Sequence, residues 1–239
     1  MQISLWSGPR NCSTALMYSF AQRSDTRVVD EPVFAHFLHF TGVHRPSRDE
    51  VLATMSIDPD EIRRSWLQHG NKHVFIKHMA NHLEGWTLDD FATHRNVILV
   101  REPRKVLKSY RAHIDRPTSM DLCYEHQLKW FQYCQARGWS VAVLNSDALI
   151  VDPERALRTL CEWLGLRFQP AMMHWTPGPR REDGVWAKYW YQRVHASTGW
   201  ERPAAPFDPN ELVPVAEEFL PLLHEIQPAY EQLCAQSII

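Results

Sequence analysis

The chain has 239 residues, of which 44% are hydrophobic and 23% are charged, a composition typical of a globular protein with a sizeable core. Its 26 basic and 28 acidic residues give a formal net charge of −2, which excludes a general attraction to nucleic acid or to an anionic membrane. The five cysteines lack CxxC spacing, so we expect reduced thiols in a cytoplasmic protein. No apolar run approaches the roughly 20 residues of a membrane span, and the N-terminus leads almost directly into the first predicted strand, so we expect no signal peptide.

The first predicted feature is a phosphate-binding loop. Residues 3–21 have the pattern of a buried strand, a tight loop from Ser7 to Thr14 and a helix. In such a loop, backbone N–H groups converge on an anion, the helix dipole adds partial positive charge, and Arg10 adds a full charge. The alternative is that Ser13 or Thr14 only caps the helix, and the Walker sequence Gly-Lys-Ser/Thr is missing.

A second predicted strand, residues 27–29, is followed by Asp30-Glu31-Pro32. Because proline disfavours helix for the residue before it, Glu31 is predicted to be extended, at the same sheet edge as the phosphate loop. A carboxylate at that position is a candidate general base for an acceptor hydroxyl, with Asp30 as the fallback. The alternative is that Glu31 only stabilises the N-terminus of a helix over residues 33–40.

The region that follows predicts an outer layer and no metal site. The histidines between residues 36 and 44 have no acidic or cysteine partner at ligand spacing, so we expect them at a surface or a pocket wall. The segment 43–70 is charged and amphipathic, and it predicts two polar helices. We expect this segment to form a helical lid near the acceptor.

Two further predicted strands end in basic residues. The strand at 72–78 carries Lys77 near its end, and the strand at 96–100 is followed directly by Arg101. Pro103 suits the first turn of the next helix, which carries Ser109. An arginine at the strand end and a serine on the following helix can both reach a phosphate at the carboxyl edge of the sheet.

The loop together with Arg101 and Ser109 resembles the PAPS-dependent sulfotransferases. In that family the first loop holds the 5′-phosphosulfate, and an arginine plus a serine eight positions later hold the 3′-phosphate. Arg10 stands where many members have lysine, and Cys12 stands where glycine is usual, so a side chain there can narrow the loop. The donor-binding residues that the resemblance implies are Arg10, Asn11, Cys12, Ser13, Thr14, Arg101 and Ser109.

The resemblance also implies three catalytic residues: Glu31, Arg10 and Lys77. Some branches of the family use a glutamate at a similar distance from the loop as the general base, and Glu31 matches it. A lysine at the end of the third strand contacts the transferring sulfonate, and Lys77 matches that lysine. Cytosolic members have a catalytic histidine two positions after this lysine, whereas here Met79 stands there and His78 is adjacent. Since adjacent strand residues point to opposite faces, His78 is a weaker candidate than Glu31.

Strand and helix alternate in the rest of the chain, with a long helix predicted at 120–137, a strand at 141–144 and a helix at 153–164. This alternation predicts a P-loop-type, three-layer α/β/α fold with a central, mainly parallel sheet of about five strands, in a single domain spanning 1–239. Ligands of such sheets bind at the carboxyl ends of the strands. The residues expected at those ends are Arg10, Glu31, Lys77 and Arg101.

The segment 176–239 is predicted to form loops and helices. Its basic, turn-rich stretch 178–186 loosely resembles the late loop that closes over the 3′-phosphate in cytosolic sulfotransferases. Arg180 or Arg181 would close over the phosphate, with a solvated charge cluster as the alternative. Ser197 can offer a hydroxyl to the sulfonate.

The sequence therefore predicts transfer of a sulfuryl group from PAPS to a hydroxyl or amine of a small-molecule acceptor, with PAP as product and without a metal. Glu31 is the expected base, while Arg10, Lys77 and the loop N–H groups stabilise charge on the sulfonate and on the departing phosphate oxygen. Two alternatives stay open. A small-molecule kinase would use the same loop, but it usually needs a Walker lysine and carboxylates for Mg²⁺. A non-catalytic nucleotide-binding protein could share the fold.

Overall fold

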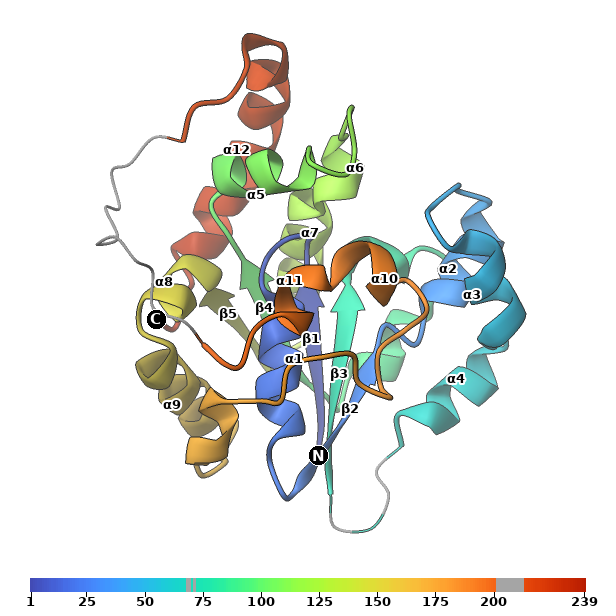
Figure 1. Cartoon of the computed structure of the whole chain (residues 1–239), viewed down its shortest axis with the longest axis vertical. Coiled ribbons are helices and arrows are strands. Elements are labelled where there is room, and N and C mark those ends of the chain that lie inside the picture. Colours follow the sequence, from blue (N-terminus) through green and yellow to red (C-terminus); the bar gives the residue numbers. More distant parts are fainter. Residues whose placement is uncertain (68–69, 71, 201–212) are drawn as a thin grey trace.

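A five-stranded sheet in the order β2-β3-β1-β4-β5 forms the centre of the computed structural model, which describes residues 1–67, 70, 72–200 and 213–239 (Figure 1). Every pair of neighbouring strands is parallel, which confirms the predicted α/β class and strand number. The strands are β1 (Gln2–Ser7), β2 (Thr26–Asp30), β3 (His73–Met79), β4 (Arg95–Val100) and β5 (Val141–Asn145).

Three helices cover one face of the sheet: α1 (Ser13–Ala21), α8 (Ser146–Val151) and α9 (Pro153–Trp163). Their buried apolar side chains pack against alternate residues of the strands. Phe20 of α1, for example, stacks on Phe75 of β3 with ring centroids 4.2 Å apart. This packing fixes α1 on the sheet, and it therefore fixes the loop that joins β1 to α1 at the carboxyl end of β1.

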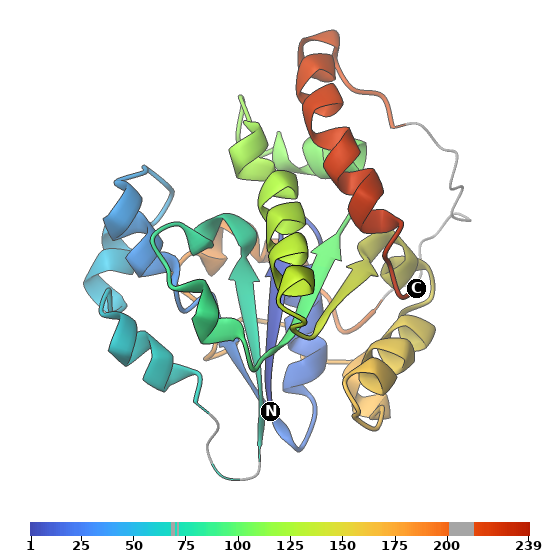
Figure 2. The same ribbon diagram turned by 180° about the vertical axis from the view of Figure 1, so that it is seen from behind.

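Helices α7 (Tyr124–Ala136) and α12 (Leu220–Cys234) cover the opposite face, as Figure 2 shows. Trp6 of β1 packs there against Phe91 and against Trp130 of α7, with ring centroids 4.8 and 5.3 Å apart. Parallel strands that are covered on both faces need apolar side chains on both, which explains the continuous apolar runs in the sequence. None of the helices in the described ranges has both the length and the apolar character needed to cross a membrane.

The long helix predicted at 120–137 is instead two helices, α6 (Ser119–Leu122) and α7, separated at Cys123. Cys123 has a φ of 69°, and a residue in the left-handed region ends an α-helix. The break lies against the loop after β1, because a Cβ atom on Gly8 would come within 2.6 Å of the Leu122 carbonyl oxygen. The close approach of the two segments requires glycine at position 8.

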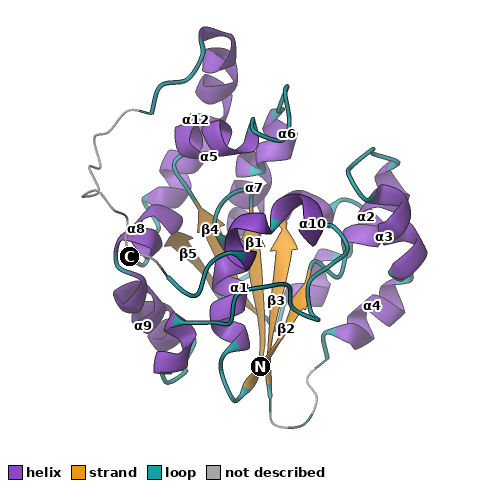
Figure 3. Cartoon of the chain, viewed as in Figure 1, coloured by secondary structure: helices purple, strands orange, loops and turns teal. Residues whose placement is uncertain are grey.

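The remaining α-helices are α2 (Phe34–Thr41), α3 (Arg48–Thr54), α4 (Pro59–Ser65), α5 (Pro103–Tyr110), α10 (Ala187–Trp190) and α11 (Gln192–His195). Helices α2, α3 and α4 lie beyond the β2 edge, while α5 and α10 lie near the carboxyl ends of the strands (Figure 3). The predicted lid, 43–70, contains two short helices; its residues 68–69, like 201–212 of the predicted segment 176–239, lie outside the described residues. Its action as a lid stays a prediction. The 3-10 helices are η1 (Ala80–Leu83), η2 (Leu88–Phe91), η3 (Pro170–Met173) and η4 (Glu217–Phe219).

Two histidines in the core make the fold sensitive to acid. His94 is buried and hydrogen-bonds Ser4 at 2.7 Å, and burial lowers its pKa to about 4. Burial also lowers the pKa of His78 well below its ordinary value. Because the unfolded chain binds protons at these residues at a higher pH than the folded chain, the contribution of these two histidines to stability is complete above about pH 6.5 and is lost as the pH falls.

We expect His94 alone to remove about 3 kcal/mol from the free energy of unfolding between pH 6.5 and 4, from its shift of about two and a half pKa units. Urea unfolding at several pH values measures this slope. His94→Gln should flatten it, whereas His224→Gln, at an exposed position on α12, should leave it unchanged. An unchanged slope in His94→Gln would contradict the prediction.

Candidate active site

A cavity of about 790 Å³ lies at the carboxyl ends of the central strands. Its wall comes from the loop after β1, the ends of β2 and β3, the residue after β4, the end of α5 and the segment of α10 and α11. Ligands of open parallel sheets bind at this edge. The residues predicted from the sequence as donor-binding or catalytic line the cavity: Arg10, Asn11, Cys12, Ser13, Thr14, Glu31, Lys77, Arg101 and Ser109.

The loop after β1 is held in a shape that suits an anion. Arg10 and Cys12 have φ angles of 59° and 62°, and alternation of left- and right-handed residues makes successive N–H groups converge. Asn11 fixes the loop, because its side chain donates to the Leu99 carbonyl at 2.9 Å and its own carbonyl accepts from Ser146 Oγ at 2.6 Å. The N-cap of α1 is Cys12, which makes no capping hydrogen bond with its side chain. The alternative of a serine or threonine cap at position 13 or 14 is therefore wrong.

The left-handed conformation of Cys12 explains why glycine is the usual residue at this position. A residue with a Cβ atom pays about 1 kcal/mol to adopt it. We expect Cys12→Gly to raise the free energy of unfolding by about 0.5–1 kcal/mol, measured by urea unfolding. Cys134→Ala, in helical conformation, is the matched control and should destabilise instead. A loss of stability in Cys12→Gly would show that the thiol side chain makes a contact worth more than the strain.

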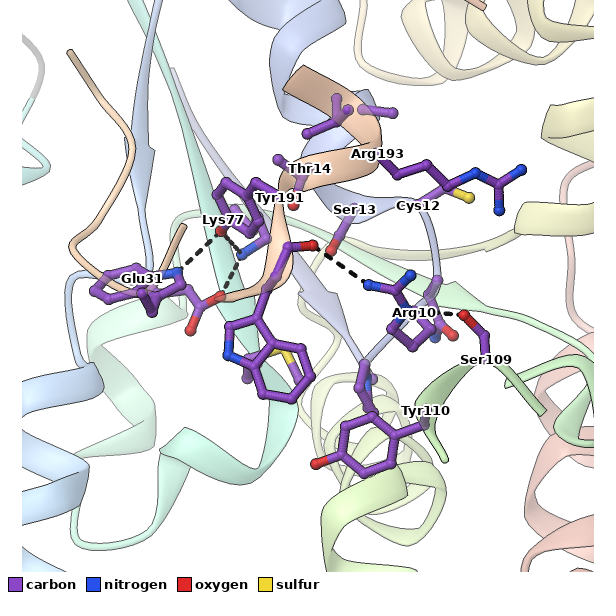
Figure 4. A pocket seen from close by; sticks show the side chains of 18 of the residues that line it. Arg10, Cys12, Ser13, Thr14, Glu31, Lys77, Ser109, Tyr110, Tyr191 and Arg193 are labelled. Carbon is purple, nitrogen blue, oxygen red and sulfur yellow. Dashed lines mark hydrogen bonds and ion pairs between the residues drawn. The ribbon is translucent and has the colours of Figure 1, made fainter. Parts of the chain in front are cut away.

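A hydrogen bond joins the two predicted phosphate-binding motifs. Arg10 Nε donates to Ser109 Oγ at 2.9 Å (Figure 4). Arg101 Nη1 donates to the Arg10 carbonyl oxygen at 2.9 Å. Arg10 Nη1 also donates to the Trp190 carbonyl at 3.3 Å. Burial lowers the pKa of Arg10, because a charged guanidinium loses solvation there. An anion in the cavity would compensate for the lost solvation, since it can accept hydrogen bonds from the guanidinium.

The arginine supplied by the C-terminal segment differs from the expectation. Arg193 of α11 lines the cavity beside the loop after β1, whereas Arg180 and Arg181 are absent from its wall and pair with Glu182 at 3.3 and 3.0 Å. Ser197 does line the cavity, but its hydroxyl donates to a backbone carbonyl at 2.8 Å. No local sequence pattern indicated Arg193, which lies two residues after the aromatic segment 186–191.

A buried ion-pair cluster lies at the ends of β2 and β3. Lys77 Nζ donates to Glu31 Oε1 and, at 2.9 Å, to Tyr191 Oη (Figure 4). It also donates to Asp30 Oδ1 at 2.9 Å. The Lys77 side chain is 2% exposed and that of Glu31 is 7% exposed. Sequence reasoning expected the lysine and the glutamate at the same sheet edge, but it did not predict their ion pair and it missed Tyr191, which lies 114 residues after Lys77.

Burial sets the proton affinities in this cluster. It raises the pKa of Glu31 to about 7; the charge of Lys77 opposes the rise and that of Asp30 adds to it. Burial also works against the charged form of Lys77, but the two carboxylates outweigh it and raise the Lys77 pKa well above its ordinary value. A carboxylate with a pKa near 7 is well matched to general base catalysis at neutral pH.

The backbone of Glu31 corrects one prediction. The residue was predicted to be extended, but its φ is 44°, in the left-handed region. Its N–H still pairs with the Lys77 carbonyl at 2.8 Å, while its own carbonyl already accepts from the Phe34 N–H at 3.0 Å. The chain must leave the sheet after Asp30 and begin α2 at Phe34, with only three residues between them. This sharp change of direction, and not the preference that Pro32 imposes, sets the conformation of Glu31. Such strain is tolerated where the surroundings hold a residue firmly, as at many functional sites.

The strand alternation at the end of β3 is as predicted. Lys77 faces the cavity, while His78 is fully buried on the other side of the sheet and stacks on Trp6 with ring centroids 4.1 Å apart. His82 of η1 lines the cavity, with its Nδ1 3.7 Å from Glu31 Oε2. Within the described ranges, no group of three histidine, cysteine or acidic side chains is arranged to hold a metal ion.

Comparison with known proteins finds relatives by sequence and solved structures with a similar fold. Branched-chain-amino-acid aminotransferase-like proteins 1 and 2 of Arabidopsis thaliana are 40% and 38% identical to this chain over 204 residues, 84% of the chain. The chain spans only 37% and 36% of the length of these relatives.

Two solved sulfotransferase domains share the fold. The domain from the Synechococcus PCC 7002 olefin synthase has a TM-score of 0.56 at 16% identity, and the match covers 98% of this chain and 94% of that one. The domain from the curacin biosynthetic pathway has a TM-score of 0.53 at 17% identity, over 77% and 80% of the two chains. The family model described as "Sulfotransferase domain" matches residues 1–231. With this match over nearly its whole length, the chain belongs to the sulfotransferase domain family.

Proposed function

We propose that the protein transfers a sulfuryl group from PAPS to a hydroxyl or amine of a small-molecule acceptor. The observation that carries the proposal is one cavity lined both by a basic anion-binding wall and by a buried carboxylate with a pKa near 7. The basic wall contains Arg10, Arg101 and Arg193, and the carboxylate is that of Glu31. The three arginines suit a donor with two phosphate groups, and the carboxylate suits removal of a proton from an acceptor.

The donor would lie along the loop after β1. N–H groups at the start of α1 and the guanidinium of Arg10 would hold the 5′-phosphosulfate, since both present donors to an anion. Arg101 and Ser109 would hold the 3′-phosphate, in agreement with their spacing. The hydrogen bond between Arg10 and Ser109 supports this arrangement, because it brings the two phosphate sites next to each other.

In the proposed reaction, Glu31 removes the proton from the acceptor hydroxyl as its oxygen attacks sulfur. The bond between sulfur and the bridging phosphate oxygen breaks, and its electron pair stays on that oxygen, which leaves as part of PAP. Arg10 and Lys77 stabilise the charge that develops on the sulfonate and the departing oxygen. The five free cysteines agree with a cytoplasmic setting for this reaction, where thiols stay reduced.

Melting temperatures measured with PAP, with ATP plus Mg²⁺ and with AMP test the donor. We expect PAP to stabilise most, by about 3 kcal/mol at a hundredfold excess over its dissociation constant. Arg101→Ala should abolish the response to PAP, whereas Arg95→Ala, at the exposed first residue of β4, should keep it. AMP should stabilise less because it lacks the 3′-phosphate.

The other possible results separate the alternatives. An equal response to AMP would argue against a 3′-phosphate site. Stabilisation by ATP with Mg²⁺ and not by PAP would favour a small-molecule kinase. A protein that binds PAP, but transfers no sulfuryl group and is unaffected by Glu31→Gln, would be a non-catalytic nucleotide-binding protein.

A further inference from the structure

Lys77 has no hydrogen-bond donor left for a substrate. Its ammonium carries three N–H groups, and each meets a protein acceptor: Asp30 at 2.9 Å, Tyr191 at 2.9 Å, and Glu31. The residue is 1% exposed, so water does not compete for these bonds. A sulfonate that approaches Lys77 therefore has to displace one of the three acceptors before the ammonium can donate to it.

Two of the three acceptors are fixed by further hydrogen bonds. Tyr191 Oη donates to Asp30 Oδ2 at 2.7 Å and accepts from Trp186 Nε1 at 3.0 Å. Asp30 Oδ2 also accepts from the Gly184 N–H at 3.3 Å. Asp30 and Tyr191 thus form a rigid pair, which joins the end of β2 to the segment of α10 that lines the cavity. Displacing either one would break several buried hydrogen bonds.

Glu31 is the acceptor that is held most weakly. Apart from Lys77, its carboxylate is approached within the described residues by His82 Nδ1, at 3.7 Å, which is too long for a hydrogen bond. Burial lowers the pKa of His82 and raises that of Tyr191, so both are neutral. The titratable groups around Glu31 are Asp30 from β2, Lys77 from β3, His82 from η1, Tyr191 from the end of α10 and the thiol of Cys123, whose pKa burial raises so that it is neutral. With both carboxylates ionised, this cluster carries one net negative charge.

We propose that Asp30 and Tyr191 are positioning residues for Lys77, and that donor binding moves the third hydrogen bond of Lys77 from Glu31 to the sulfonate. Glu31 therefore loses its hydrogen bond with Lys77 only when the donor is bound. It can then take the proton from the acceptor hydroxyl without competition from Lys77. This inference rests on the proposed function. It also predicts proton uptake, because the sulfonate adds negative charge beside Glu31 and removes a hydrogen bond from its ionised form.

Calorimetric titration of the whole chain with PAPS at pH 7.5, in two buffers of different ionisation enthalpy, counts the protons taken up. We expect the wild type to take up about half a proton or more beyond the count of Glu31→Gln. PAP, which lacks the sulfonate, should give a smaller difference between the two proteins. In turnover, the acid limb of kcat should lie at higher pH than that of kcat/KM for PAPS. The reason is that kcat reports the donor-bound enzyme, whereas kcat/KM for PAPS reports the enzyme without donor.

Tyr191→Phe tests the positioning role. Without the hydroxyl, Lys77 regains one N–H, so the sulfonate can bind without displacing Glu31. The extra proton uptake should fall toward the count of Glu31→Gln, and the two acid limbs should move together. A merely structural role would lower stability without changing the proton count. Tyr189→Phe, at a position on α10 that is 42% exposed, is the matched control and should behave as the wild type.

The outcomes distinguish this inference from the proposed function. Failure of the wild type to bind PAPS would overturn both. Binding of PAPS with the same proton count in the wild type and in Glu31→Gln would overturn the exchange, while the proposed donor would stand. A full wild-type proton count in Tyr191→Phe would overturn the role of Tyr191.

Discussion

Glu31→Gln is expected to lower kcat for sulfuryl transfer by about 100- to 10,000-fold, the range that a positioned general base contributes. Glutamine keeps the size of the side chain and can still accept from Lys77, but it cannot take a proton from the acceptor. In the wild type, kcat/KM for PAPS should rise with pH through about 7, because burial raises the pKa of Glu31 to about 7 and only the ionised form acts as a base. The variant should lose this rise.

Two controls isolate the chemical step. The melting-temperature response to PAP should survive in Glu31→Gln, since the donor's phosphates are expected on the arginine wall. Glu84→Gln replaces an exposed glutamate and should keep full activity. A kcat within about tenfold of the wild type in Glu31→Gln would remove Glu31 from the role of base and would direct attention to Asp30.

Lys77→Met is expected to lower the free energy of unfolding by about 3–5 kcal/mol. The methionine fills a similar volume, but it leaves the carboxylates of Asp30 and Glu31 buried without the cation between them. Glu31 can relieve part of the cost by taking up a proton, whereas the Asp30 side chain is completely buried and, among the described residues, keeps the hydrogen bonds from Tyr191 and Gly184. Urea unfolding at pH 7 measures the loss.

A second substitution separates lost charge from lost packing. Adding Asp30→Asn to Lys77→Met should restore part of the stability, because it removes the unpaired charge and keeps an oxygen for Tyr191. Lys188→Met breaks an exposed pair with Glu50 and should have no measurable effect. A loss below about 1 kcal/mol in Lys77→Met would mean that the buried cluster is not held by its charges.

Local sequence pattern was enough to predict one half of the candidate site. The loop after β1 and the pair Arg101 and Ser109 depend on the order of strand, loop and helix, which neighbouring residues set through periodicity and turn chemistry. Because all the strands are parallel, their carboxyl ends meet at one edge, and Glu31 and Lys77 were expected there for the same reason. These residues do line one cavity.

The other half depends on contacts between distant parts of the chain. Tyr191 and Arg193 reach the cavity from a segment with no local pattern that points to it, and Arg180 and Arg181 were expected in their place. The break at Cys123, which divides a stretch of uniform helical pattern, was missed for a similar reason. It accompanies a close approach to the loop after β1 that no local rule describes.

The sequence by itself determined the alternation of strands and helices, the parallel direction of the strands, and the presence of Arg10, Glu31, Lys77 and Arg101 at the carboxyl edge of the sheet, because these follow from local periodicity and chain direction. Only the tertiary structure decided the proton affinity of Glu31 and the partners of Lys77. Both depend on burial and on the Tyr191 hydroxyl, which comes from a position 160 residues after Glu31 in the chain. The energy of a charge depends on everything packed around it, and that environment exists only once the chain has folded.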